Sequence, residues 1–552
     1  MNGFHDPDRM YMERFGDIHV FRPRLETELE VRAEAEQHLR ARFNIGRYDN
    51  KNEINAILHH NFAFYSGLLD QVLPGIASIH FLKFVLFHFD QYTQVDRLQR
   101  EEQLDREEDD RWTRIGPSLR RAAKYLAERM CFIRPREAPR ADERQLLGLS
   151  ERAWIGAEQV INLYMESDLA FIAFPGQTLL KIFPPGEKLY LQQTIVGDCP
   201  DLAARVRYDG LDHVRFIPDA PILSNLDTQD QYIGAAVQDV VGLNYRNTMG
   251  VLAHVVRGCR AAPGGFPIPF MHKERAIEHF ARALNFPGAA VELAINGFSV
   301  SRRQMNAENR ELWRPNREFR AFRRAFFEVP HATGEHFVFS PGMAEDAFTI
   351  LIREAAFGQF PQEWRSDQLT QELGRLGNAA GRWFERVVEH NCQQISFVGQ
   401  RSATHYIGSG EMRIRIPPDI GEIDFIGYSE RERILLILEC KLVRYSFEAR
   451  YHRDDIYDFA LSDQSHANKF RRKCAWVQNN LRQISAALNS LQPLRNVHIV
   501  PMRLARAIIT LHPTMATCFI DDVPCVSLAE LMLDYEAMEN WPYEIGVSEI
   551  NI

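Results

Sequence analysis

Two acidic residues and a lysine stand close together near the end of the chain. Asp424 lies in residues 421–428, and Glu439 and Lys441 lie in residues 434–443. Neighbouring carboxylates repel unless a cation lies between them, and hard oxygen ligands of this kind favour Mg²⁺ or Mn²⁺. A bound divalent ion offers a nucleophile at neutral pH and neutralises charge on a phosphate, as phosphodiester hydrolysis requires. The three residues therefore predict a site for a divalent metal ion with a lysine beside it, a combination that suits such hydrolysis.

The spacing of Glu439 and Lys441 places both side chains on one surface. Side chains alternate across a strand, so residues two positions apart point to the same face. An ammonium group beside the carboxylates can position the attacking water and stabilise negative charge. The alternative interpretation is a structural ion pair at the end of a strand.

The surrounding residues predict the element that carries this group. Two β-rich segments flank the short charged run 429–433, which is typical of a hairpin. The apolar run 434–438 is typical of a buried central strand, where Glu439 and Lys441 are unfavourable without partners. A local rule broken at the end of a buried strand indicates function.

Asp424, a hairpin turn and Glu439-x-Lys441 together resemble the signature of the PD-(D/E)XK nuclease superfamily. Restriction enzymes, junction resolvases and repair exonucleases share this signature. The resemblance implies that Asp424, Glu439 and the backbone carbonyl of Cys440 bind Mg²⁺, which Mn²⁺ can replace. It also implies that Lys441 orients or activates the attacking water. The match covers about residues 369–534.

Two further details belong to the resemblance. Ile423 stands where the family name has proline, a departure that costs no metal ligand. The segment 377–385 resembles the helix that precedes the family's sheet and carries a third acid, which would be Glu385, as a catalytic residue and metal ligand. Glu389 lies one turn later on the same side, so it is the alternative. Gly381 and Glu385 reproduce the family spacing and favour Glu385, with a solvated glutamate as the other alternative.

Basic and polar residues after the hairpin are candidates for contacts with nucleic acid. The apolar positions from 470 to 488 predict one long helix, and the family packs such a helix beside its active site. Another face of this helix could touch phosphate, although a solvated face is the alternative. The candidates on it are Lys469, Lys473 and Gln483.

A second set of candidates lies in an arginine-rich segment interleaved with aromatic residues. Arg317, Arg320 and Arg324 share one helical stripe. Guanidinium groups beside aromatic rings suit phosphate contacts and base stacking. Interspersed glutamates dilute the charge, so a solvated or interdomain helix is the alternative.

The length of 552 residues exceeds what one hydrophobic core usually supports, so several domains are expected. An α-rich N-terminal region is predicted over residues 1–130, and a mixed α+β middle region over 131–365. An α/β nuclease domain with a central mixed sheet flanked by helices is predicted over 366–535. A tail follows over 536–552. The regions before the nuclease domain are expected to serve recognition or regulation.

Composition limits the classes of protein. A formal net charge of −9 excludes a surface that is basic throughout, so any contact with nucleic acid must be local. The eight cysteines include no CxxC pair and are expected to be reduced thiols in a cytoplasmic protein. No secretory signal is visible, and no apolar run is long enough to span a bilayer, so no contact with membrane is expected.

The sequence therefore predicts a Mg²⁺-dependent nuclease that acts on nucleic acid, most of all DNA, as an endonuclease rather than an exonuclease. By analogy of fold, a setting in prokaryotic antiviral defence is expected. A homo-oligomer or a protein partner is left open. The alternative is a catalytically silent protein that binds nucleic acid or acts as a scaffold on a nuclease-like fold. A silent member would be expected to lose Asp424, Glu439 or Lys441, yet all three are present.

Overall fold

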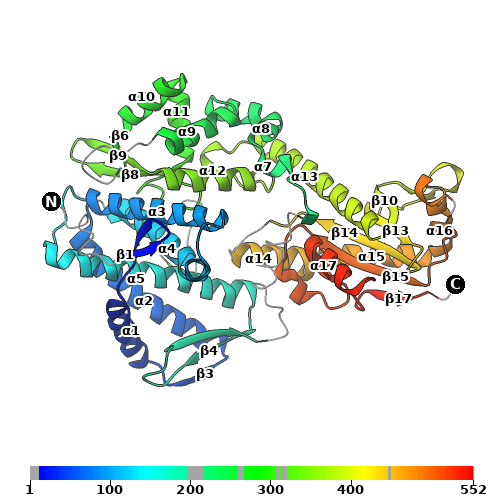
Figure 1. The fold of residues 1–552 in the computed structure, drawn as a ribbon, viewed down its shortest axis with the longest axis horizontal. Helices are drawn as coiled ribbons and strands as arrows, with labels where there is room; N and C mark the ends of the chain where they lie inside the picture. The colour runs from blue at the N-terminus through cyan, green and yellow to red at the C-terminus, as the bar shows by residue number, and fades with distance from the viewer. Residues whose placement is uncertain are drawn as a thin grey trace. The chain divides into compact units, whose positions relative to one another are not determined.

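The computed structural model of the protein describes residues 12–133, 135–196, 215–258, 267–305, 311–312, 320–444, 449–495 and 497–550. Its contacts divide the chain into two compact units (Figure 1). The first unit contains Met1–Thr194 and Asn225–Leu373, and the second contains Ile195–Ser224 and Gly374–Ile552. The regions expected over 1–130 and 131–365 thus lie together in the first unit, except for Ile195–Ser224, which belong to the second unit.

The first unit is mainly helical, as expected for its N-terminal part. Helices α2, α3, α4 and α5 pack beside one another, and α12 packs against α3 and α9. Polar side chains cap several of these helices, and the hydroxyl of Ser340 accepts a hydrogen bond from the first turn of α12. The longer helices are α1 (Leu25–Arg40), α2 (Lys51–Ile76), α3 (Ile79–Arg100), α4 (Arg106–Ile133), α5 (Glu143–Asp168), α8 (Leu226–Val241), α9 (Tyr245–Gly258), α10 (Lys273–Leu284), α11 (Gly288–Gly297) and α12 (Pro341–Ala355).

Small sheets accompany these helices, so the middle of the chain is mixed α and β as predicted. One hairpin joins β1 (Met12–Phe15) and β2 (Ile18–Phe21). The second sheet has the order β3-β4-β5 and the third has the order β6-β9-β8-β7. Their bounds are β3 (Gly46–Tyr48), β4 (Thr178–Ile182), β5 (Leu191–Ile195), β6 (Phe270–His272), β7 (Ser299–Val300), β8 (Phe326–His331) and β9 (Gly334–Phe339).

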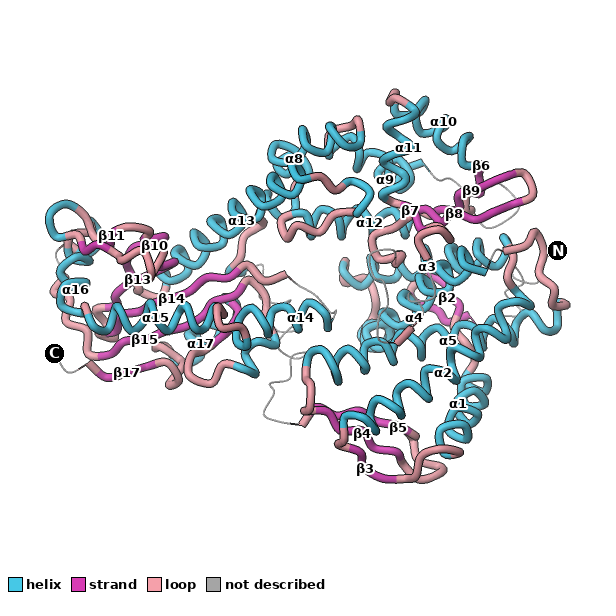
Figure 2. The backbone as a smooth tube through the Cα atoms, turned by 180° about the vertical axis from the view of Figure 1, so that it is seen from behind, coloured by secondary structure: helices cyan, strands magenta, loops and turns pink. Residues whose placement is uncertain are grey.

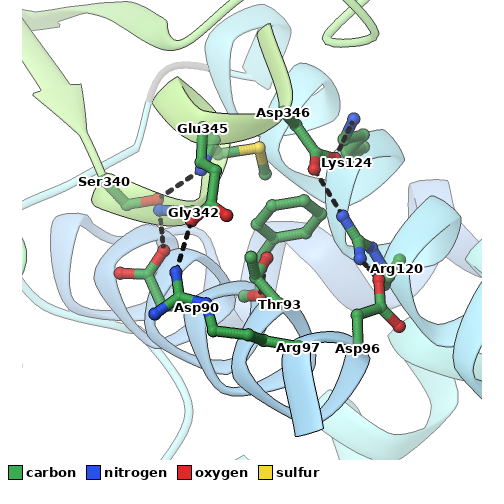
Figure 3. Close-up of polar contacts among 12 residues, drawn as sticks. Asp90, Thr93, Asp96, Arg97, Arg120, Lys124, Ser340, Gly342, Glu345 and Asp346 are labelled. Atoms are coloured by element: carbon green, nitrogen blue, oxygen red, sulfur yellow. Dashed lines mark hydrogen bonds and ion pairs between the residues drawn. The ribbon is translucent and has the colours of Figure 1, made fainter. Parts of the chain in front are cut away.

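A polar network ties α12 to α3 and α4 (Figure 3). Asp346 on α12 accepts contacts from Arg120 at 2.6 Å and from Lys124 at 2.9 Å. Asp90 on α3 accepts a hydrogen bond of 2.8 Å from the backbone N–H of Gly342. These contacts join helices far apart in sequence, which explains why residues on either side of position 130 belong to one unit.

The second unit is built on a mixed sheet with the strand order β10-β13-β14-β15-β16, and β17 also pairs with β15. Strands β10, β13 and β14 are antiparallel, whereas β14, β15 and β16 are parallel. The central mixed sheet flanked by helices is therefore present. The bounds are β10 (Val398–Ala403), β13 (Ile423–Ser429), β14 (Ile434–Lys441), β15 (Arg503–Thr510), β16 (Cys525–Ser527) and β17 (Val547–Glu549), with the short pair β11 (Tyr406–Ile407) and β12 (Ile414–Arg415) outside the sheet.

Helices cover both faces of this sheet (Figures 1 and 2). Leu435 and Ile437 of β14 share a core with α15 (His466–Asn479) and α16 (Leu481–Asn489). Leu436 and Leu438 share the opposite core with α13 (Asp367–Gln394) and α17 (Leu528–Met538). The alternation of β14 therefore assigns Glu439 and Lys441 to the face covered by α15. This unit also contains the short α-helices α7 (Pro221–Ser224) and α14 (Ala449–Ile456).

Three features of the second unit differ from the sequence-based expectations. The long helix expected up to residue 488 is divided at Asn480, whose backbone φ of −119° and ψ of 21° are not helical. Within the predicted tail, Val547–Glu549 form β17, which pairs with β15, and Trp541 is buried, so residues 541–549 pack onto the sheet. Cys518 forms a disulfide, so the expectation of reduced thiols fails there.

Five other cysteines are free and buried: Cys131, Cys392, Cys440, Cys474 and Cys525. Within the described ranges, each helix is too short or too polar to cross a membrane.

Candidate active site

The β13–β14 hairpin brings the predicted acids face to face. Its register ends with Phe425 opposite Leu438, so Asp424 and Glu439 are the next residues along the two strands. At this point the Asp424 carboxylate accepts a hydrogen bond of 2.8 Å from the backbone N–H of Cys440. The side chain of Asp424 is thereby held against β14 where the ladder between the two strands ends.

Lys441 lies beside both carboxylates on the same face of the sheet. Its Nζ atom is 2.7 Å from Oε1 of Glu439 and 3.6 Å from Oδ2 of Asp424. Both acids are buried, with 7% of Asp424 and 3% of Glu439 exposed. The structure therefore brings together the three residues that the sequence analysis grouped.

Lys473 joins this group from helix α15. Its Nζ atom is 2.6 Å from Oε2 of Glu439 and 4.0 Å from Oδ1 of Asp424, and the residue is only 8% exposed. Lys473 is therefore not on a solvated helix face, and its contact with phosphate stays a prediction. The physical reason is that it precedes the buried Cys474 and so lies at the edge of the apolar face that α15 turns to the sheet.

The pKa values of the two acids shift in opposite directions. Burial, followed by the charge of Glu439, raises the pKa of Asp424 to about 6. Burial also acts to raise the pKa of Glu439, but the charges of Lys441 and Lys473 outweigh it and the pKa is lowered. The difference follows from the distances, because both ammonium groups make direct contacts with Glu439 and lie farther from Asp424.

Lys441 remains charged in this setting. Burial acts to lower the pKa of its ammonium group, but the charges of Glu439 and Asp424 outweigh burial and raise the pKa. A protonated amine at this place can stabilise negative charge and donate hydrogen bonds, although it cannot accept a proton at neutral pH.

Glu385 approaches the same end of the sheet from helix α13 without joining the cluster. Its carboxylate accepts a hydrogen bond from the hydroxyl of Ser402. Burial raises the pKa of Glu385, and the charge of Lys441 opposes this shift. Glu389 instead pairs with Arg401 at 2.9 Å. The electrostatic effect of Lys441 is in keeping with the choice of Glu385 over Glu389, but the role of Glu385 as a third ligand stays a prediction.

The remaining candidates on the helices after the hairpin are separated from each other. Lys469 is exposed on α15, and Gln483 is exposed on the next helix, α16. Both side chains are thus accessible to a polyanion, and their contact with nucleic acid stays a prediction.

Two of the candidate arginines, Arg320 and Arg324, are occupied by partners inside the first unit. Arg320 pairs with Glu128 at 2.8 Å and lies over the ring of Tyr164. Arg324 is 1% exposed and donates a hydrogen bond of 3.0 Å to the carbonyl of Gly297. Their prediction as nucleic-acid contacts is wrong because internal acceptors take both guanidinium groups. Arg317 lies outside the described residues.

His466 is a further neighbour of the cluster, and the sequence analysis did not name it. It begins α15, and burial, followed by the charge of Lys441, lowers the pKa of its imidazole to about 4. The ring is therefore neutral at pH 7. The signal in the sequence is its position seven residues before Lys473, which places the two residues on the same side of a helix.

The donor chemistry of the cluster fits a hard divalent cation. Asp424 and Glu439 offer carboxylate oxygens, and Cys440 offers a backbone carbonyl between Glu439 and Lys441. Among the residues that the structure describes, no three His, Cys, Asp or Glu side chains form a group that could hold a metal ion. A cation would therefore depend on the two carboxylates and on oxygens from the backbone, water or substrate.

No protein-family model, curated protein or solved structure matches the chain. The function must therefore be inferred from the residues themselves. Two buried acids that lie beside each other, with a lysine protonated at neutral pH on the same face, can bind a cation and hold a phosphate next to it.

Proposed function

We propose that the second unit hydrolyses phosphodiester bonds of nucleic acid, foremost DNA, with Mg²⁺ as the metal. The observation that carries the proposal is the placement of Asp424, Glu439 and Lys441 on one face, at the ends of two neighbouring strands. Burying two carboxylates side by side is costly, and such a cost at the end of a central strand indicates selection for chemistry.

Each residue has a defined part in this proposal. Asp424 and Glu439 would hold Mg²⁺ or Mn²⁺ together with the carbonyl of Cys440, and Glu385 would support the site from α13. The bound ion would supply a nucleophile at neutral pH and neutralise charge on the phosphate. Lys441 keeps its proton and so serves to orient water and stabilise the negative charge of the phosphate.

Exposed polar residues on the helices after the hairpin are the proposed contacts with the substrate. Lys469 and Gln483 are the exposed candidates for contacts with the nucleic acid backbone. Endonuclease action is proposed, with recognition or control assigned to the first unit and prokaryotic antiviral defence as the setting.

The direct test uses the purified full chain with supercoiled plasmid, linear duplex, single-stranded DNA and RNA. Cleavage is expected with Mg²⁺ or Mn²⁺ and is expected to stop with EDTA. Asp424→Ala should remove it, whereas Glu430→Ala, which changes an exposed acid in the turn of the same hairpin, should retain it. A wild-type protein that cleaves none of these substrates with either metal contradicts the proposal.

One observation favours a second candidate, a nuclease-like protein that binds nucleic acid without cleaving it. Each oxygen of Glu439 already has a lysine partner, at 2.7 Å and 2.6 Å, so the cluster is internally satisfied. In that case the substrates above would be bound but not cleaved, and the affinity would not depend on Asp424.

A further inference from the structure

The four charges of the cluster come from separate parts of the second unit. Asp424, Glu439 and Lys441 belong to the hairpin, whereas Lys473 arrives from helix α15. Two carboxylates and two ammonium groups cancel one another, so the buried cluster is neutral without any added ion. Lys473 therefore supplies the one positive charge of the cluster that does not come from the hairpin.

The two lysines contact different oxygens of the two acids. Lys441 faces Oε1 of Glu439 and Oδ2 of Asp424. Lys473 faces Oε2 of Glu439 and Oδ1 of Asp424. The Oδ2 atom of Asp424 also accepts the backbone N–H of Cys440. If Lys441 stays in place, two carboxylate oxygens remain that could hold a cation between the acids: Oδ1 of Asp424 and Oε2 of Glu439. These are the two oxygens that Lys473 faces.

We propose that Lys473 is a resident counter-ion that competes with a divalent cation for Oδ1 of Asp424 and Oε2 of Glu439. The inference rests on the proposed function for the identity of the cation. It gives Lys473 a regulatory part, because the cation binds only when the ammonium group withdraws from the pair of acids.

Charge balance supports withdrawal rather than joint occupancy. A divalent cation added beside both lysines would give the buried cluster a net charge of +2, which is unfavourable away from water. If Lys473 withdraws, the net charge is +1, which the single negative charge of a phosphodiester can balance. The long flexible stem of a lysine allows its ammonium to move toward solvent while the stem stays packed. Cation binding, release of Lys473 and phosphate binding are therefore linked.

The test compares Lys473→Met with the wild-type full chain. Methionine preserves much of the stem and removes the charge, and Lys469→Met is the matched control on the exposed side of the same helix. Calorimetric titration with Mn²⁺ should give binding at least about tenfold tighter for Lys473→Met, because a competing buried charge is gone. Lys469→Met should bind like the wild type. Equal or weaker binding by Lys473→Met overturns the inference.

A second readout does not depend on activity. In EDTA, Lys473→Met should unfold at a lower temperature than the wild type, because two buried acids then share one lysine, and Mn²⁺ should recover the loss. Lys473→Arg keeps the positive charge and should therefore bind Mn²⁺ with nearly the wild-type affinity. If Lys473→Arg gains as much affinity for Mn²⁺ as Lys473→Met does, the lysine does not compete with the cation through its charge. If Lys473→Met does not fold, Lys473→Gln takes its place in the same titration.

The outcomes separate this inference from the proposed function. Wild-type cleavage without tighter Mn²⁺ binding by Lys473→Met leaves the nuclease proposal standing and removes the counter-ion. If Lys473→Met binds Mn²⁺ more tightly but the wild type cleaves no substrate, the counter-ion proposal stands and the nuclease proposal fails. If neither protein binds Mn²⁺, both proposals fail.

Discussion

Asp346 in the first unit and Asp424 in the second each lie beside two cationic side chains, yet their pKa values move in opposite directions. For Asp346 burial acts to raise the pKa, but the charges of Lys124 and Arg120 outweigh burial and lower it to about 2. For Asp424 burial, followed by the charge of Glu439, raises the pKa to about 6. Burial is common to both sites, so the neighbours decide the sign.

The contacts explain the difference. The two oxygens of Asp346 have one cation each, at 2.6 Å from Arg120 and 2.9 Å from Lys124 (Figure 3). The cations near Asp424 are 3.6 Å and 4.0 Å away, because both are bonded to Glu439. A fully paired buried acid is typical of a structural network, whereas an acid left short of positive charge is a candidate for function.

The largest expected effect breaks the fully paired acid. Asp346→Asn should lower the free energy of unfolding by about 3 kcal/mol, because Lys124 and Arg120 lose a half-buried partner, although Arg120 keeps its ion pair with Asp96. Asp424→Asn should cost much less, since the folded site already disfavours the charged form of Asp424. Scanning calorimetry of the full chain in EDTA measures both variants. Equal losses would mean that the two sites do not differ in the way described.

The next effect concerns Lys441, which separates catalysis from binding. If its ammonium stabilises charge that develops in the transition state, Lys441→Ala should slow single-turnover cleavage by about 100-fold or more while changing DNA affinity little. Lys124→Ala is the counterpart in the first unit and should reduce stability without slowing saturated cleavage. A Lys441→Ala protein that cleaves at the wild-type rate once saturated would remove the proposed mechanism.

A smaller effect is expected in the dependence of stability on pH. The pKa of Asp346 is lowered from 3.8 to about 2, so its stabilising contribution is present above pH 4 and is lost as the pH falls through 2. The pKa of Asp424 is raised from 3.8 to about 6, so its contribution is present below pH 4 and is lost as the pH rises through 6.

Chemical denaturation from pH 3 to pH 8 therefore sharpens the comparison. Relative to the wild type, Asp346→Asn should be least harmful at acid pH. The free energy of unfolding of Asp424→Asn, relative to that of the wild type, should increase above pH 6. Parallel pH profiles for the wild type and both variants would contradict the opposite shifts.

The smallest expected effect is that of Glu385. Glu385→Gln should reduce metal-dependent cleavage by roughly tenfold, the order expected when a supporting residue of a metal site is changed. Glu389→Gln is the matched control, since that acid pairs with Arg401. Cleavage rates at saturating Mg²⁺ measure both, with thermal unfolding as a check on the fold. A larger loss for Glu389→Gln would reverse the assignment.

The hairpin was predictable from local sequence because its information is local. Two apolar segments and a short charged turn fix the antiparallel pairing of β13 and β14, and strand alternation then fixes the common face of Glu439 and Lys441. The strands β15, β16 and β17, which complete the sheet, were not predicted one by one. Periodicity also did not predict the division of the long helix at Asn480, because the apolar positions continue across it.

The arginine stripe shows where periodicity misleads. Arg320 and Arg324 are spaced as on an exposed helix face, and the prediction of phosphate contacts rested on that spacing. In the structure Arg320 meets Glu128, which is far away in sequence, and Arg324 meets backbone carbonyls. Side-chain charge alone cannot tell a surface guanidinium from one that satisfies internal acceptors.

The sequence by itself determined the hairpin, the mixed sheet with its helices, and the grouping of Asp424, Glu439 and Lys441. Only the tertiary structure decided that Lys473 completes the cluster and that Asp346 pairs with Arg120 and Lys124. The physical reason is the range of the interactions. Alternation and turn preferences act over a few residues, whereas the partner of a buried charge depends on which helix covers which face of a sheet, and that is settled by packing across the whole unit.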